Sequence, residues 1–94
     1  MFSWDDLRHF LAFARSGSTV AAGKALGVNQ STVHRRLTVL EQSLGCRLLE
    51  RHLGGNYLTD LGRDLLPYAE RVEEAAAALE RRIASSEKGA TGTL

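Results

Sequence analysis

The chain has little cysteine, proline or aromatic content, and it has no long apolar run. Its single cysteine, Cys46, excludes an internal disulfide and suits a reducing compartment. With one proline and few alternating β-branched residues, the 94 residues favour one small, mainly α-helical domain. No stretch approaches the roughly 18 apolar residues of a membrane span, and the first residues lack a signal-peptide pattern. We therefore expect a cytoplasmic protein with no membrane partner.

Neither sign of charge is in large excess over the whole chain, but the positive and negative residues are distributed unevenly along it. The net charge is +1. Residues 1–58 carry seven Arg or Lys against four Asp or Glu, whereas residues 59–94 carry five against seven. A basic surplus in the first segment is what attraction to nucleic-acid phosphates requires.

Three short helices are predicted in this basic segment. Apolar residues at helical spacing and polar caps place them over about residues 4–15, 19–26 and 30–44. The expected N-caps are Ser3, Ser18 and Asn29, and the expected stops are Gly17, Gly27 and Gly45. The glycine turn between the second and third helices is typical of a helix-turn-helix motif.

The third predicted helix carries an unusual set of exposed side chains. It opens with Asn29-Gln30-Ser31-Thr32 and continues with His34-Arg35-Arg36. Amides, hydroxyls and arginines are the groups that bind base edges and phosphates, whereas a solvated helix face usually mixes Glu with Lys. This helix is therefore predicted to contact DNA. The pattern does not decide whether Thr32 faces the core or solvent.

Two short segments, about residues 47–51 and 56–58, flank a Gly-Gly turn and predict a β-hairpin, or wing. Thr59 then caps a long helix that is expected to end near Ser85 and to kink at Pro67. Its apolar residues repeat every seven positions, as in a helix that pairs with a second copy. They are Leu65, Ala69, Val72, Ala76, Leu79 and Ile83. We expect a DNA-binding head over 1–58, a dimerisation helix over 59–86 and a flexible hinge over 87–94.

Groups of residues that support catalysis or bind metal are missing from the sequence. Its three histidines have no partner at metal-ligand spacing, and a zinc site needs about four grouped ligands. No Ser/His/Asp grouping or Gly-rich phosphate loop is present, so we expect no enzyme, no metal and no cofactor. Two other function classes stay open: a stand-alone winged-helix repressor that senses a ligand or metal, and a helical protein-interaction module.

Ordered landmarks along the chain carry a family resemblance. They include Leu7-x-x-Phe10, Gly17-Ser18, Ala22-Gly23-x-x-Leu26-Gly27-Val28, Leu40-Glu41-x-x-Leu44-Gly45, Arg47-Leu48-Leu49-x-Arg51 and Leu58-Thr59-x-x-Gly62. The chain resembles the N-terminal DNA-binding domain of a LysR-type transcriptional regulator. The resemblance implies a winged helix-turn-helix followed by a linker helix, and a homodimer on a pseudo-palindromic double-stranded DNA operator. It also implies tetramers of the full-length protein, and a small-molecule effector bound only by a C-terminal domain that begins near residue 92.

The pattern and the resemblance together nominate nine residues for DNA contact. They are Ser18, Gln30, Ser31, Thr32, His34, Arg35, Arg36, Arg51 and Asn56. We expect base-edge contacts from Gln30, Ser31, His34 and Arg35, and backbone or wing contacts from Ser18, Arg36, Arg51 and Asn56. The family usually has Ala where this chain has Gly23 and favours Ser where it has His34, so family half-site sequences do not carry over.

Overall fold

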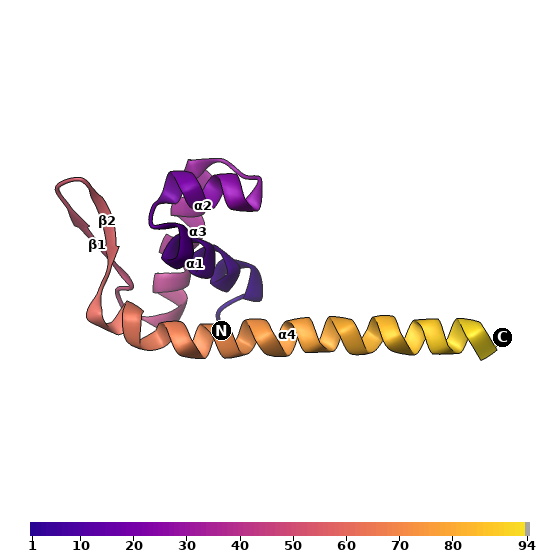
Figure 1. Cartoon of the computed structure of the whole chain (residues 1–94). Helices are drawn as coiled ribbons and strands as arrows, with labels where there is room; N and C mark the ends of the chain where they lie inside the picture. The colour runs from indigo at the N-terminus through magenta and orange to yellow at the C-terminus, as the bar shows by residue number, and fades with distance from the viewer. Residues whose placement is uncertain (94) are drawn as a thin grey trace.

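Three helices and a β-hairpin form a head that stands beside the first half of a long fourth helix (Figure 1). The computed structural model describes the backbone of residues 1–93 and the side chains of residues 1–86. The helices are α1 (Trp4–Ser16), α2 (Thr19–Leu26), α3 (Gln30–Leu44) and α4 (Asp60–Thr93), and the hairpin strands are β1 (Leu49–His52) and β2 (Gly55–Leu58). The predicted mainly α, winged helix-turn-helix fold with a long linker helix is confirmed.

Two of the three N-caps predicted for the short helices make the expected hydrogen bond. The Ser3 hydroxyl accepts from the Asp6 N–H at 3.1 Å, and the Ser18 hydroxyl accepts from the Ala21 N–H at 3.0 Å. Asn29 occupies the N-cap position of α3, but its side chain makes no capping hydrogen bond, so that part of the prediction is wrong. The first turn of α3 is held instead by the Asn29 carbonyl, which accepts from the Thr32 and Val33 N–H groups.

The core lies where α1 crosses α3 and the start of α4. Phe10, Leu11, Leu40 and Leu48 are almost completely buried there, with Val33 beneath the helix-turn-helix. Full burial of each such side chain stabilises the fold by about 1.5–3 kcal/mol. This packing fixes which side of α3 is left for solvent.

The turn between α2 and α3 depends on a close backbone approach at Gly23. A Cβ atom at this position would lie 2.7 Å from the Val28 carbonyl oxygen, closer than van der Waals contact permits. That stretch of backbone leads directly into α3. Gly23 therefore fixes where the third helix begins.

Polar contacts fix the base of the wing to the helices on both sides. The Glu41 carboxylate of α3 accepts from the Leu48 N–H at 2.7 Å and the Leu49 N–H at 3.1 Å. The Thr59 hydroxyl donates to the Arg47 carbonyl and accepts from the N–H of Gly62 in the first turn of α4. The hairpin is thus anchored at its root, and its free end projects away from α4 (Figure 1).

Helix α4 runs to Thr93, well past the head, in a molecule whose principal extents are 59 × 24 × 19 Å. The predicted end near Ser85 is wrong. Adding a residue to an existing helix adds a hydrogen bond without a new nucleation cost, and no proline follows Ser85 to stop it. The helix also continues through Pro67, where the expected kink stays a prediction. The side chains from Glu87 onward, and Leu94 entirely, lie outside the described part.

The predicted dimerisation stripe on α4 is divided between two environments. Leu65 packs against the core and Ala69 is buried in it, so these two stabilise the head itself. Ala76 is half-buried, whereas Leu79 is 61% exposed and Ile83 is 49% exposed. Leu65 and Ala69 are therefore used by the head, and the predicted role of the stripe in dimerisation stays a prediction.

Candidate nucleic-acid interface

The outward side of α3 carries Ser31 and Arg35, one helical turn apart. Val33, Leu37 and Leu40 point into the core, so these two positions face solvent. Among the side chains that the structure describes, neither Ser31 nor Arg35 has a hydrogen-bond or ion-pair partner. A guanidinium and a hydroxyl that the fold does not use are available to a ligand. We call this pair the outer row of α3.

A second row, made of Gln30, His34 and Thr38, faces the wing. The Gln30 amide donates to the hydroxyl of buried Thr19 at 3.0 Å, which orients its carboxamide while its oxygen stays available. The Thr38 hydroxyl donates to the His34 carbonyl at 3.0 Å, so it is partly used within the helix. We call these three residues the wing-side row.

A groove of about 580 Å³ separates the wing-side row from the wing. His34 and Thr38 line it on α3, and Arg51 and Asn56 line it on the hairpin. Arg51 and Asn56 are direct cross-strand partners, so their side chains share one face of the hairpin. The structure therefore brings four polar side chains from distant segments to one groove.

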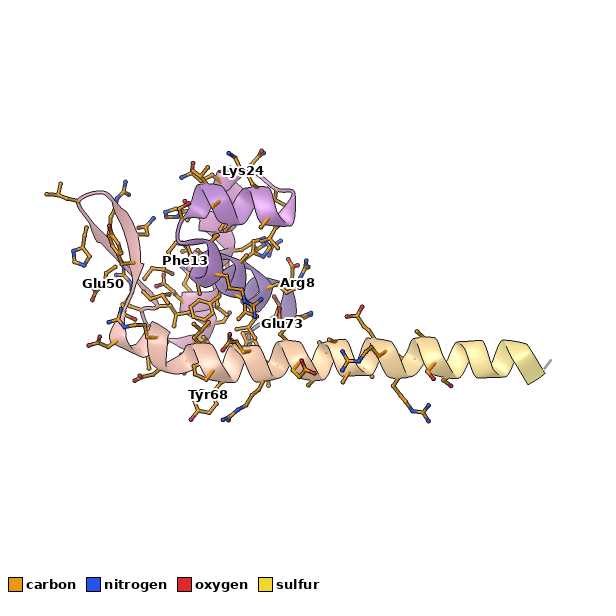
Figure 2. All side chains as sticks on the ribbon, in the orientation of Figure 1. Arg8, Phe13, Lys24, Glu50, Tyr68 and Glu73 are labelled. Atoms are coloured by element: carbon orange, nitrogen blue, oxygen red, sulfur yellow. The ribbon has the colours of Figure 1, made fainter. Side chains whose placement is uncertain are left out.

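The opposite face of the wing carries a separate cluster. Glu50 and His52 alternate with Arg51 along β1, and Tyr57 pairs with Glu50 across the hairpin. The His52 imidazole lies 3.0 Å from the Glu50 carboxylate, and its ring centre is 5.9 Å from that of Tyr57. Figure 2 shows Glu50 on the side of the wing that faces away from the three helices. These side chains are therefore turned away from the groove.

Arg36 differs from its neighbour Arg35. Its guanidinium lies 3.5 Å from the carboxylate of Asp6, which is only 3% exposed. A buried carboxylate is costly unless it is paired, so this contact supports the packing of α1 on α3. The structure turns Arg36 toward α1, away from the outer row, and its contact with the DNA backbone stays a prediction.

Two further predicted residues have partial structural roles. The Ser18 hydroxyl accepts a hydrogen bond as the cap of α2, and its own hydrogen is still available for donation. Thr32 is half-buried between the outer row and the core. Thr38 was not predicted as a site residue, although its position four residues after His34 places it on the same side of the helix. Thr19 was not predicted either, because its contact with Gln30 depends on tertiary packing.

No helix in the described part of the chain combines the length and apolar character needed to cross a membrane. Among the side chains of residues 1–86, no three His, Cys, Asp or Glu gather as they would around a metal ion.

A comparison with protein families decides the identity of this architecture. The model of the bacterial regulatory helix-turn-helix proteins of the lysR family matches residues 4–63. The chain belongs to the LysR family. It is a winged helix-turn-helix DNA-binding domain of that family, and the outer row and the groove lie on its third helix and wing.

Similar proteins in this family are transcriptional regulators. The chain is 43% identical over 88 residues to a probable hydrogen peroxide-inducible genes activator of Mycobacterium xenopi, covering 94% of the chain and 47% of that protein. A related activator of Mycobacterium avium is 44% identical, with 26% of its length covered. The LysR domain described here thus spans between about a quarter and a half of these relatives.

Solved structures of similar domains include complexes with DNA. The DNA-binding domain of CbnR in complex with DNA superposes with a TM-score of 0.82 at 35% identity, covering 90% of this chain and 98% of that one. The BenM DNA-binding domain on catB site 1 DNA superposes with a TM-score of 0.80 at 28% identity, covering 92% and 96%.

Proposed function

We propose that this LysR-family domain binds a specific double-stranded DNA site as a homodimer that regulates transcription. In this proposal α3 enters the major groove, and the wing lies at the adjacent backbone and minor groove. The observation that carries it is the outer row of α3, whose arginine and hydroxyl have no use within the fold and stand beside a polar groove. The DNA complexes of CbnR and BenM support the placement, because domains of the same fold bind DNA in them.

Each side chain at this surface has chemistry that suits a particular part of DNA. Arg35 suits a bidentate contact with guanine, and Ser31 suits either a base edge or a phosphate. Gln30, oriented through Thr19, presents its amide oxygen as an acceptor. Arg51 and Asn56 suit the sugar-phosphate backbone, since they project from the wing rather than from α3. The Ser18 hydroxyl, at the start of α2, suits a flanking phosphate.

A second copy of the chain fits the exposed stripe on α4. Leu79 and Ile83 continue the stripe past the head and are 61% and 49% exposed among the described side chains, and Val72 at the edge of the head is 39% exposed. Pairing two such helices buries these apolar side chains, which favours association by about 25 cal/mol per Å². A twofold pair carries two DNA-binding heads, so we infer a pseudo-palindromic site.

The side chain of Arg35 provides the first test of this proposal. We expect Arg35→Ala to weaken binding to the selected DNA site by about 1–3 kcal/mol and to relax base preference at one position of each half-site. Arg8 is a matched control, because it lies on α1 on the side away from the wing and pairs only with Asp5 (Figure 2). Titration of labelled duplex measures both variants. Equal affinities for Arg35→Ala and Arg8→Ala would contradict the assignment.

The two other function classes predict different results for the unaltered chain. A helical interaction module predicts no DNA binding, whereas phosphate neutralisation makes specific binding fall steeply with salt. A stand-alone metal sensor predicts bound metal, which elemental analysis of the purified chain detects. Effector binding by a C-terminal domain, and a hinge over residues 87–94, stay proposals that rest on the longer relatives.

A further inference from the structure

The groove between α3 and the wing continues toward the start of α2. A second hollow of about 640 Å³ shares Thr19, Arg51 and Asn56 with the first, and it reaches Ser18. Together the two hollows form one channel that runs along the wing-side row of α3. The channel is open to solvent and is lined by polar side chains from three elements.

The proposed docking determines which part of DNA enters this channel. One sugar-phosphate strand separates the major groove of DNA from the minor groove beside it. If α3 occupies the first and the wing the second, that strand passes between α3 and the wing. Side chains that line the first hollow then meet phosphates, whereas the outer row of α3 meets base edges.

His34 stands in the wing-side row. The sequence predicts that His34 contacts a base edge. The structure places it in the groove opposite Arg51 and Asn56, and not in the outer row of α3. Within the described part of the chain, its imidazole has no hydrogen-bond or ion-pair partner. We propose that His34 contacts a DNA phosphate in this channel and that DNA binding takes up a proton at its imidazole. This inference rests on the proposed function.

Other charged and titratable groups line the groove around His34. Arg51 of β1 and Arg47 of the loop before it both line the groove, so a phosphate that enters meets positive charge there. Glu41 of α3 also lines the groove, but its carboxylate accepts two backbone N–H groups and lies 3.5 Å from Arg47. The remaining titratable group there is the Cys46 thiol. A phosphate that enters the groove brings a negative charge to the imidazole, and this charge favours the protonated ring in the complex.

The test compares the pH dependence of DNA binding in matched variants. Affinity for the selected duplex is measured at constant salt between about pH 6 and about pH 8, either side of the range in which histidine ordinarily titrates. Calorimetry in two buffers of different ionisation enthalpy counts the protons taken up. For the unaltered chain we expect tighter binding at the lower pH, by up to about tenfold per pH unit for one linked proton.

The variant His34→Asn keeps a hydrogen-bonding side chain but cannot titrate in this range. We expect it to lose the proton uptake and to keep the base preference of the unaltered chain. His52→Asn is the control, because His52 lies beside Glu50 and lines only the second hollow, not the first, which holds His34. Proton uptake by this variant should equal that of the unaltered chain. Circular dichroism confirms that both variants are folded.

Three results would overturn the inference. They are binding of the unaltered chain with no proton uptake, uptake that persists in His34→Asn, and a change of base preference in His34→Asn that shows contact with a base. If the unaltered chain binds DNA in any of these cases, the proposed function survives and only the role of His34 fails. An unaltered chain that does not bind DNA would reject both.

Discussion

Neighbouring residues of the same type have different roles in this domain. Arg35 and Arg36 adjoin in sequence, yet Arg36 pairs with buried Asp6 while Arg35 faces solvent. The direction of each side chain follows from the packing of α1 against one side of α3. Tertiary packing therefore distinguishes an arginine that is paired within the fold from one that is available to a ligand.

Arg15 of α1 forms an ion pair with Glu73 of α4, and the Glu70 carboxylate lies 3.9 Å from the same guanidinium. Two hydrogen bonds join Arg15 to Glu73, at 2.8 and 2.5 Å, and Figure 2 shows Glu73 on the side of α4 that faces α1. The hydrogen bond from Arg15 lowers the pKa of Glu73 below its usual value. A lowered carboxyl pKa contributes stability at pH values above the unfolded pKa, and this contribution is lost as the pH falls through the folded value.

We expect Glu73→Gln to reduce the free energy of unfolding by about 0.2–1 kcal/mol near neutral pH. The value is small because both side chains are close to half-exposed and solvent screens the pair. The difference between the two proteins should shrink as the pH falls below about 4. Urea unfolding at a series of pH values measures it, and a difference that is constant down to about pH 2 would contradict this role.

At the scale of elements, the α2–α3 turn sets the position of the DNA-contacting helix. A methyl group at Gly23 meets the Val28 carbonyl oxygen at 2.7 Å, and neither backbone segment can move without displacing the start of α3. Although the family usually has Ala here, the backbone of this chain has closed to 2.7 Å of the Cβ position, so we expect Gly23→Ala to require a backbone shift and to cost about 1–3 kcal/mol of stability. Lys24→Ala, at the exposed next position of α2, is the control. Urea unfolding compares them, and a Gly23→Ala domain as stable as the parent would refute the close contact.

The outer half of α4 is the element proposed to hold the dimer together. We expect Leu79→Glu to shift the dimer toward monomer, because it places a charge in the apolar seam. Ala78→Glu introduces the same charge on another side of the helix, also at an exposed position, and should leave the association unchanged. Sedimentation at several concentrations measures both. Equal association of the two variants would show that this stripe is not the interface.

At the scale of the whole molecule, local sequence patterns predict the helices and strands. Tertiary packing determines which side chains of each element are buried and which are exposed. Caps, apolar spacing and the Gly-Gly turn were sufficient to predict the three helices, the wing and the long helix. They did not show that Leu65 and Ala69 are used by the head, because the heptad pattern is the same in a head core and in a dimer seam. The turning of Arg36 toward Asp6, and of His34 toward the wing, likewise depends on segments distant in sequence.

Binding selection from a random pool of duplexes tests the proposed dimer on DNA as one assembly. If the domain binds as a twofold pair with α3 in the major groove, the enriched DNA should contain two inverted half-sites. Their centres should lie about one helical turn, or a multiple of it, apart. The Arg35→Ala domain, selected in parallel, should lose preference at one position in each half. Recovery of a single unrepeated site, or of no enriched sequence at all, would contradict the account.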